Sequence, residues 1–251
     1  MRVLLLSDIH SNIEALEACL SAAPAYDLVM NLGDVVGYGA NPNEAVQRSR
    51  ELGGYIVRGN HDKAVAGLID LGEFNPLAGM AALWTRNKLT AENLQWLRQL
   101  PQGPIQIPGL SDTQFVHGSP VDEDQYLVTS IDALESLLAV PMPVTFFGHS
   151  HVQGAFSSNP AENGSLRPIY ASVGRAESVD WALEEGTHYL VNPGSVGQPR
   201  DGDWRAGFAI FDSQTKTVKF LRVPYDLKTA QERIVAANLP PRLATRLAIG
   251  R

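Results

Sequence analysis

The sequence predicts a mixed α/β fold in which two mixed β-sheets pack together and are flanked by helices. In the first hundred residues, short apolar runs alternate with stretches of helical spacing, which is typical of parallel βαβ units. In the second half, short apolar runs follow one another with intervening turns, which is typical of antiparallel hairpins. A connection rich in proline and glycine at residues 100–109 separates the halves and allows only a short strand at 105–107.

Three apolar runs in the first half are predicted strands, and helical spacing follows them along the chain. We expect these strands at residues 3–6, 28–30 and 55–57. The helix after the second strand should begin at Asn41 as cap, with Pro42 at the first helical position and Glu44 closing a capping box. Further helices are expected from about residue 13, after Asn75-Pro76 and after Thr90.

The second half is richer in strands and contains one predicted helix, at about residues 131–138. Its strands are expected at residues 113–116, 144–147, 154–156, 168–171, 189–191, 208–211 and 218–223. A basic segment follows, in which arginines stand among alanine and leucine residues at positions Arg233, Arg242, Arg246 and Arg251. It fits a homo-oligomer contact, an amphipathic helix or a solvated terminal helix, and we favour the last.

Composition excludes several classes of function. A mixed chain of 251 residues commonly forms one unit, so we expect a single domain over residues 1–251. The net charge of −7 argues against duplex nucleic acid as a partner. Cys19 is the only cysteine, which rules out an intramolecular disulfide and a thiolate metal cluster. The apolar run at 3–6 is too short for a signal peptide or membrane span, so we expect a cytoplasmic protein.

Five of the six histidines stand in short cassettes with other polar residues, at or near the ends of predicted strands. The cassettes are Asp8-Ile9-His10, Gly33-Asp34, Gly59-Asn60-His61-Asp62, His117-Gly118 and Gly148-His149-Ser150-His151. In open α/β sheets, ligands gather beyond the carboxyl ends of the strands. We therefore expect these side chains to meet at one edge of the fold.

The chemistry of the cassettes predicts two divalent metal ions per chain. Side chains two residues apart on an extended stretch point the same way, so Asp8 and His10 can converge on one ion. Asp34 follows an apolar strand, where a carboxylate shared by two ions is well placed and an unpaired one is costly. Imidazole and carboxylate donors suit Mn, Fe, Co, Ni or Zn better than Mg. Taken alone, each such residue is more often a turn or cap residue or an ordinary histidine, but their joint order favours a metal site.

The cassettes resemble the calcineurin-like metallophosphoesterase superfamily, whose pattern D-x-H, G-D, G-N-H-[DE], H and G-H-x-H occurs here in full and in order. The segment Asn192-Pro193-Gly194-Ser195-Val196, followed by Arg200, resembles the loop that closes the site in small bacterial and archaeal members. The resemblance implies a four-layer αββα sandwich, in agreement with the two predicted sheets. It also implies one metal on Asp8, His10 and His151, another on Asn60, His117 and His149, and Asp34 bridging them.

The resemblance further implies that a hydroxide shared by the two metals attacks the phosphorus atom in line. His61 would face the phosphate as general acid or charge stabiliser, and Arg200 and Asn12 would position the phosphate. Gly37 and Tyr38 stand where the protein-phosphatase branch has an Asp that orients the catalytic His and an Arg that grips phosphate. Protein-phosphatase activity is therefore disfavoured.

The leading hypothesis is a metal-dependent phosphoesterase that acts on a small phosphodiester or phosphomonoester. An alternative substrate is a nucleotide, either a dinucleoside polyphosphate or a cyclic nucleotide. Tyr38, Trp204 and Tyr225 are candidates for base stacking, although ordinary core packing explains each of them better. A non-catalytic interaction scaffold of the same fold is the alternative from another class. Such a scaffold is expected to have lost ligand residues, and this sequence retains all of them.

Overall fold

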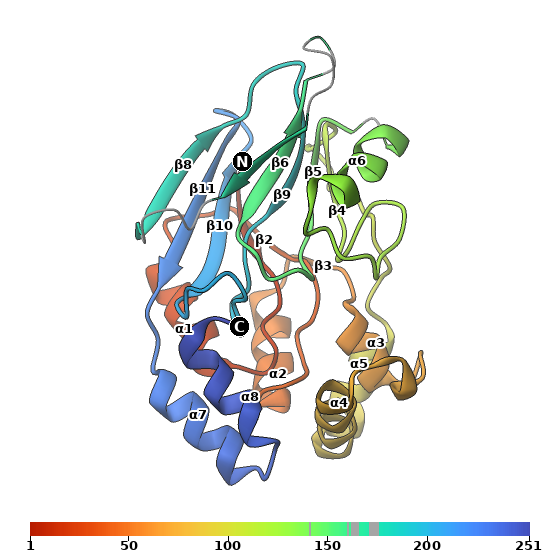
Figure 1. The fold of residues 1–251 in the computed structure, drawn as a ribbon, viewed down its shortest axis with the longest axis vertical. Coiled ribbons are helices and arrows are strands. Elements are labelled where there is room, and N and C mark those ends of the chain that lie inside the picture. The colour runs from red at the N-terminus through yellow and green to blue at the C-terminus, as the bar shows by residue number, and fades with distance from the viewer. Residues whose placement is uncertain (141, 160, 162–165, 171–175) are drawn as a thin grey trace.

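The structure consists of two β-sheets packed face to face, with helices on their outer sides (Figure 1). The computed structural model describes residues 1–140, 142–159, 161, 166–170 and 176–251. The six-stranded sheet has the order β3-β2-β1-β10-β11-β8, with bounds β1 (Arg2–Leu6), β2 (Leu28–Asn31), β3 (Tyr55–Ile56), β8 (Ser178–Ala182), β10 (Ala206–Asp212) and β11 (Thr217–Val223). The five-stranded sheet has the order β4-β5-β9-β6-β7, with bounds β4 (Thr113–Phe115), β5 (Val144–Phe146), β6 (Gly154–Ser158), β7 (Leu166–Tyr170) and β9 (His188–Asn192).

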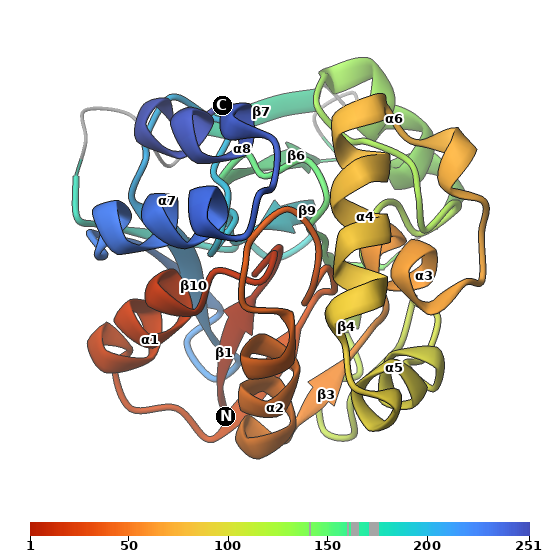
Figure 2. The same ribbon diagram turned by 90° about the horizontal axis from the view of Figure 1, so that it is seen from below.

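Most of the described helices pack beside the six-stranded sheet, as the view from below shows (Figure 2). They are α1 (Ile13–Ala22), α2 (Pro42–Leu52), α3 (Asn60–Ala66), α4 (Pro76–Lys88), α5 (Ala91–Arg98), α7 (Leu227–Ala236) and α8 (Pro241–Thr245). The helix α6 (Ser130–Ala139) packs on the outer face of the five-stranded sheet. The layers are thus helix, sheet, sheet and helix, which confirms the predicted αββα sandwich.

Successive side chains of a strand point to opposite faces of the sheet, so one strand contributes to two hydrophobic cores. In β1, Val3 and Leu5 point into the core between the sheets, whereas Leu4 and Leu6 point into the core beneath the helices. All four side chains are fully buried, so the sequence of β1 is a continuous apolar run instead of an alternating one. Burial on both faces is the reason that β1 and β10 form the centre of the six-stranded sheet.

The predicted element order is confirmed for most of the described residues, with three local differences. Residues 105–107 form no strand, and Ile105 makes only an isolated bridge to Phe115. The strand β8 was not predicted, because it lies at a sheet edge with mostly exposed side chains and has no apolar pattern. The helix α3 was not predicted either, and begins within the third cassette, where Asp62 accepts a hydrogen bond from the Gly59 amide at 3.0 Å. Residue 171, the last of the predicted strand 168–171, lies outside the described residues.

Two further expectations about helices and pairing need correction. The capping box of α2 does not form, because the Asn41 side chain donates to the Glu44 carboxylate at 3.2 Å instead of bonding the helix backbone. In the second half, β6 and β7 pair antiparallel as expected, but β4, β5 and β9 pair in parallel. The helix α6 lies between β4 and β5 along the chain and makes this a crossover connection.

The basic C-terminal segment is packed against the rest of the fold, so the solvated helix we favoured is wrong. The side chains of Ile234, Leu243 and Leu247 are almost fully buried in the core beneath the helices. Its amphipathic character, which was the alternative, explains this packing. Each of the described helices is too short or too polar to serve as a membrane span.

Candidate metal centre

The predicted ligands meet at the carboxyl ends of the strands. Asp8 and His10 follow β1, and Asp34 follows β2. The two loops run side by side, because the Asp8 amide donates to the Gly33 carbonyl at 3.0 Å and the His10 amide donates to the Asp34 carbonyl at 3.0 Å. The other ligands come from the start of α3, from the end of β4 and from the turn between β5 and β6; they are Asn60, His117, His149 and His151.

Backbone strain is concentrated in these loops. Nine non-glycine residues of the described chain have positive φ angles, and five of them are predicted ligands: Asp8 (54°), His10 (47°), Asp34 (56°), His149 (63°) and His151 (59°). L-residues avoid this region, and each instance costs about 1–3 kcal/mol. Such strain persists only where surrounding structure enforces it, and it is characteristic of functional sites.

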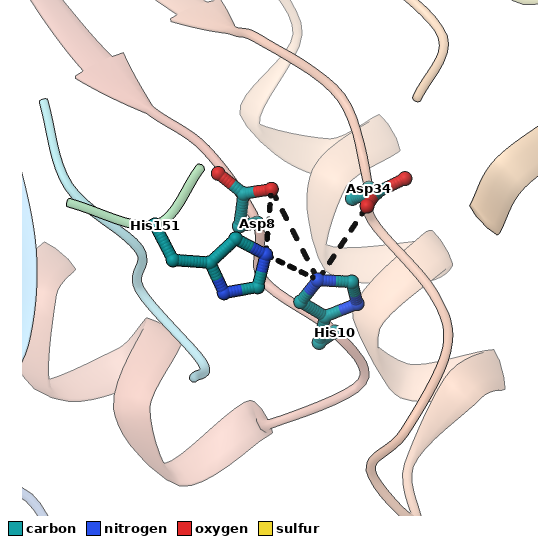
Figure 3. A group of neighbouring side chains, drawn as sticks. All are labelled: Asp8, His10, Asp34 and His151. Atoms are coloured by element: carbon teal, nitrogen blue, oxygen red, sulfur yellow. Dashed lines mark hydrogen bonds and ion pairs between the residues drawn. The ribbon is translucent and has the colours of Figure 1, made fainter. Parts of the chain in front are cut away.

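The first cluster joins the two loops after β1 and β2 with the turn that carries His151 (Figure 3). The His151 Nε2 atom lies 3.2 Å from the Asp8 Oδ1 atom and 3.1 Å from the His10 Nε2 atom. The His10 Nε2 atom lies 3.5 Å from the Asp34 Oδ2 atom. All four side chains are at most 1% exposed, and their ligand atoms lie within 4.8 Å of one another.

The second cluster shares Asp34 with the first. The Asp34 Oδ2 atom lies 3.5 Å from the His117 Nε2 atom, which in turn lies 3.1 Å from the His149 Nδ1 atom. The Asn60 Oδ1 atom lies 3.3 Å from the same His117 nitrogen. The structure therefore brings together all seven predicted ligands, in the two groups that the family resemblance implies.

The histidines are oriented as metal ligands by the main chain. In each, the ring nitrogen that faces away from the cluster is close to a backbone carbonyl: His10 at Val36 (3.1 Å), His117 at Leu32 (2.7 Å), His149 at Asp124 (3.0 Å) and His151 at Gln198 (2.6 Å). A carbonyl only accepts, so this nitrogen carries a proton, and whenever the ring is neutral the inner nitrogen presents a lone pair. Lone pairs facing each other at 3.1 Å repel unless a cation or proton lies between them. The donor set thus fits divalent metal ions.

The electrostatics of the clusters favour positive charge at the same place. Burial raises the pKa values of Asp8 and Asp34, but the neighbouring histidines outweigh it and hold both values below the usual range. Burial lowers the pKa values of His10, His149 and His151, so these rings are neutral and free to bind a cation at neutral pH. At His117 the effect of burial is outweighed, chiefly by Asp34, and the pKa rises to about 9.

His61 lies beside the first cluster and lines an open cleft of about 290 Å³. Its ring packs against Tyr38 at 4.4 Å and edge-on against Phe74 at 4.9 Å, measured between ring centroids. Its amide donates to the Asp34 Oδ1 atom at 2.8 Å, whereas its Nδ1 atom has no hydrogen-bond partner among the described residues. Burial lowers the pKa of His61 to about 4, so the ring is neutral at pH 7.

Gly37 leaves the space that the His61 ring occupies. A Cβ atom at this position would lie 2.6 Å from the His61 Nδ1 atom, and the φ angle of +104° disfavours any side chain. The position where the protein-phosphatase branch carries an orienting carboxylate is thus filled here by the imidazole itself. Contacts with Tyr38 and Phe74 hold the ring instead of a hydrogen bond to Nδ1.

The two predicted phosphate-positioning residues differ in their surroundings. Arg200 reaches the site, where its Nη2 atom lies 3.5 Å from the Tyr38 hydroxyl and 3.1 Å from the Gln198 side-chain oxygen. Asn12 uses both polar groups within the protein: its oxygen caps α1 by accepting from the Ala15 amide, and its nitrogen donates to the Gly197 carbonyl. A phosphate contact by Asn12 stays a prediction.

The three aromatic candidates for base stacking lie in different parts of the structure. Tyr38 lines the cleft, and its ring centroid lies 4.7 Å from that of His10 and 5.8 Å from the Arg200 Cζ atom, so it belongs to the site. Trp204 and Tyr225 pack on each other at 5.7 Å and belong to the core beneath the helices. This agrees with ordinary packing for those two residues.

The sequence did not point to the loop that follows His117. Its Tyr126 ring stacks on the His149 ring at 3.7 Å between centroids, and is 46% exposed at the mouth of the cleft. The loop is held by Lys63, a buried residue of α3 that forms ion pairs with Glu123 and Asp124. A lysine directly after the Asn-His-Asp cassette was the available signal, but its partners lie some sixty residues away in the chain.

Comparisons with known proteins agree with this geometry. The chain matches the family model of the calcineurin-like phosphoesterase superfamily domain over residues 1–216. It is 38% identical over 251 residues to the uncharacterized protein MJ0912 of Methanocaldococcus jannaschii, and the match covers 99% of this chain and 98% of that protein. The crystal structure of a metallophosphoesterase from Sphaerobacter thermophilus is similar at 39% identity, with a TM-score of 0.87 and 100% coverage of both chains. The hypothetical protein PH1004 from Pyrococcus horikoshii OT3 has the same fold at 22% identity, with a TM-score of 0.78 and coverage of 100% of this chain and 98% of that one.

Proposed function

Because this chain belongs to the calcineurin-like phosphoesterase superfamily, we propose that it is a metal-dependent hydrolase of a small phosphodiester or phosphomonoester. One observation carries the proposal beyond the family. Two clusters of buried donors share the Asp34 carboxylate and are lined by histidines whose outer nitrogens contact main-chain carbonyls. This arrangement supports two divalent ions per chain, drawn from Mn, Fe, Co, Ni or Zn, with Mn as our first choice for reconstitution.

The residues that would hold the ions divide into two groups around Asp34. Asp8, His10 and His151 form the first, and Asn60, His117 and His149 form the second. When bound, two such cations lower the pKa of coordinated water towards neutrality and offset the charge on phosphate oxygens.

His61 supplies a hydrogen bond from the protein side. Its ring is neutral at pH 7 because burial lowers its pKa to about 4, so it offers one N–H donor to a phosphate or leaving oxygen. The negative charge of a bound phosphate favours the imidazolium, which makes His61 a general acid only when substrate is in place. Arg200 lies beside Tyr38, with its Cζ atom 5.8 Å from the ring centroid, and would present guanidinium donors to the phosphate.

A nucleotide substrate is the alternative supported by a specific observation. Aromatic rings surround the cleft, with Tyr38, Phe74 and Tyr126 among its lining residues. Tyr126 is both exposed and stacked on a ligand histidine, which suits contact with an aryl group or a base. Protein-phosphatase activity remains disfavoured, since Gly37 and Tyr38 supply neither the orienting carboxylate nor the arginine of that branch.

The experiment is a panel of aryl monoesters, aryl diesters and nucleotides, run on protein loaded separately with Mn, Ni, Zn and Mg. We expect close to two ions per chain by elemental analysis and turnover with at least one transition metal. Fewer than about one ion per chain, together with no hydrolysis of any ester, would favour the non-catalytic scaffold over the enzyme.

A further inference from the structure

Two arginines, Arg200 and Arg246, lie close to the Tyr38 ring although they come from different segments of the chain. The Arg200 Cζ atom and the Arg246 Cζ atom each lie 5.8 Å from the centroid of the Tyr38 ring. That ring lies 4.7 Å from the His10 ring and 4.4 Å from the His61 ring. The Tyr38 ring is therefore in contact with two histidines of the candidate metal centre and lies close to both guanidinium groups.

Among the described residues, neither guanidinium group is paired with the carboxylate of an Asp or Glu side chain. Arg200 bonds to Gln198 and to Tyr38, and the Arg246 Nε atom donates to the main-chain oxygen of Arg251. The Arg200 Nε atom is buried without a hydrogen-bond partner among the described residues. Burial and then the charge of Arg200 lower the pKa of Arg246. Two half-buried cations near the same ring repel each other, and a bound anion that contacts both offsets that cost.

The segment that carries Arg246 is fixed to the loop that carries Arg200. The Gly202 amide, two residues after Arg200, donates to the Gly250 carbonyl at 3.0 Å. Gly250 has a φ angle of +60°, and a Cβ atom there would lie 2.7 Å from the Asp203 amide nitrogen. The two segments therefore meet at a contact that only glycine allows, and the arginines are held in place before any ligand binds.

The helices α7 and α8 lead to Arg246; α7 packs beside α1, and α8 packs against α7 (Figure 2). Within α8 and the turn after it, Leu243 and Leu247 are buried, and the Gln231 side chain donates to the Ala244 carbonyl at 2.8 Å. The family model ends at residue 216, so this whole segment lies outside the part of the chain it matches. Arg246 thus lies outside the matched family domain, on a C-terminal segment that packs against it, which suits a role in substrate selection.

We propose, as an extension that rests on the phosphoesterase function above, that Arg246 acts with Arg200 to bind a further phosphate group of the substrate. The preferred substrates then carry at least one phosphate beyond the one that is hydrolysed. Arginine suits this role because its planar fork gives paired hydrogen bonds to phosphate oxygens and keeps its charge at any working pH. A polyphosphate chain or a nucleotide with more than one phosphate meets the requirement. A simple phosphodiester has no further phosphate group for the two arginines to bind.

The test is calorimetric binding of phosphate, pyrophosphate and tripolyphosphate to the manganese-loaded protein. We expect wild-type protein to bind at least one of the longer ions about tenfold or more tighter than phosphate. Arg246→Leu should lose about tenfold of that affinity while its affinity for phosphate changes less than about threefold, and Arg246→Lys should lose less than Arg246→Leu. Arg242→Leu is the matched control, because Arg242 is an exposed arginine on α8.

Pyrophosphate and tripolyphosphate also bind manganese, but this contribution is the same for every variant and does not affect the difference in affinity between the variants. Equal preference for the longer ions in wild type and Arg246→Leu overturns the role of Arg246, as does a wild type with no such preference. Thermal unfolding of each variant shows that Arg246→Leu is folded, and the lysine variant keeps the comparison should the leucine variant be unstable. Failure of the metal-loaded enzyme to hydrolyse any ester counts against the phosphoesterase function alone, because the binding measurement does not need turnover.

Discussion

His61 should make the stability of the metal-free protein fall as the pH is lowered. The folded protein holds the pKa of His61 at about 4, against 6.5 for an unperturbed histidine. Between these values the unfolded chain binds a proton that folded His61 does not, so the stabilising difference is complete above pH 6.5 and is lost as the pH falls towards 4. The difference of 2.5 pH units, at about 1.36 kcal/mol per unit, amounts to about 3.4 kcal/mol over the whole window.

The perturbation is His61→Gln, which removes the titrating group and keeps a polar side chain. Urea unfolding in the presence of a chelator, followed by tryptophan fluorescence at about pH 6.0, 5.25 and 4.5, gives the free energy of unfolding of each variant. We expect the wild-type free energy to fall more steeply than that of the variant, by about 1.2 kcal/mol per pH unit near pH 5.25 or about 1.7 kcal/mol over this range. His188→Gln, on β9 outside the site, measures the effect of removing a half-buried histidine elsewhere.

Equal slopes for the wild type and His61→Gln would refute the reasoning, because they would mean that folded His61 takes up its proton as readily as the unfolded chain does. Folded His61 would then carry a proton in a substantial fraction of molecules near pH 7, and the uniformly neutral donor of the proposed function would be wrong. A steeper wild-type slope supports a ring that becomes an acid only beside bound phosphate.

Three further predictions concern the centre itself. Asp34→Asn should lose most of both metal ions and all activity, since both clusters share this carboxylate. His61→Ala should keep its metal ions and lose about 10²–10⁴-fold in turnover. Elemental analysis together with kinetics distinguishes the two outcomes. Gly37→Ala should lower turnover with metal content nearly intact, because the added Cβ atom meets His61 at 2.6 Å, and an unchanged kcat would contradict this. Lys63→Met should weaken metal affinity by about tenfold or more without touching a ligand, because it frees the loop that orients His149; chelator competition measures this loss.

Most of the elements could be predicted because their signals are local. The apolar runs of β1, β2 and β10 and the polar residues at their ends are visible within a few neighbouring positions. The errors fall where local pattern is weak or misleading. The exposed edge strand β8 has no apolar period, and the arginines of the C-terminal segment concealed an apolar face formed by Leu243 and Leu247.

Part of the site could also be predicted from local sequence. Asp8 and His10 stand two residues apart, and Asn60 and His61 are adjacent, so residue types and spacing were enough to predict a metal centre from the sequence alone. The family resemblance implied that Asp34 is shared, and the measured distances to His10 and His117, both 3.5 Å, are consistent with that role.

What the sequence determined by itself is therefore the fold class, the strand-end cassettes and the identity of the seven candidate ligands. Only the tertiary structure decided which side chains surround them: the Tyr126 ring on His149, the main-chain carbonyls behind each imidazole and the approach of Arg246 to Tyr38. The physical reason is one of range. Period and turn chemistry act over a few residues, whereas Tyr38 and Arg246 meet across most of the chain, through the strand order and the packing of α7 and α8 against the rest of the fold.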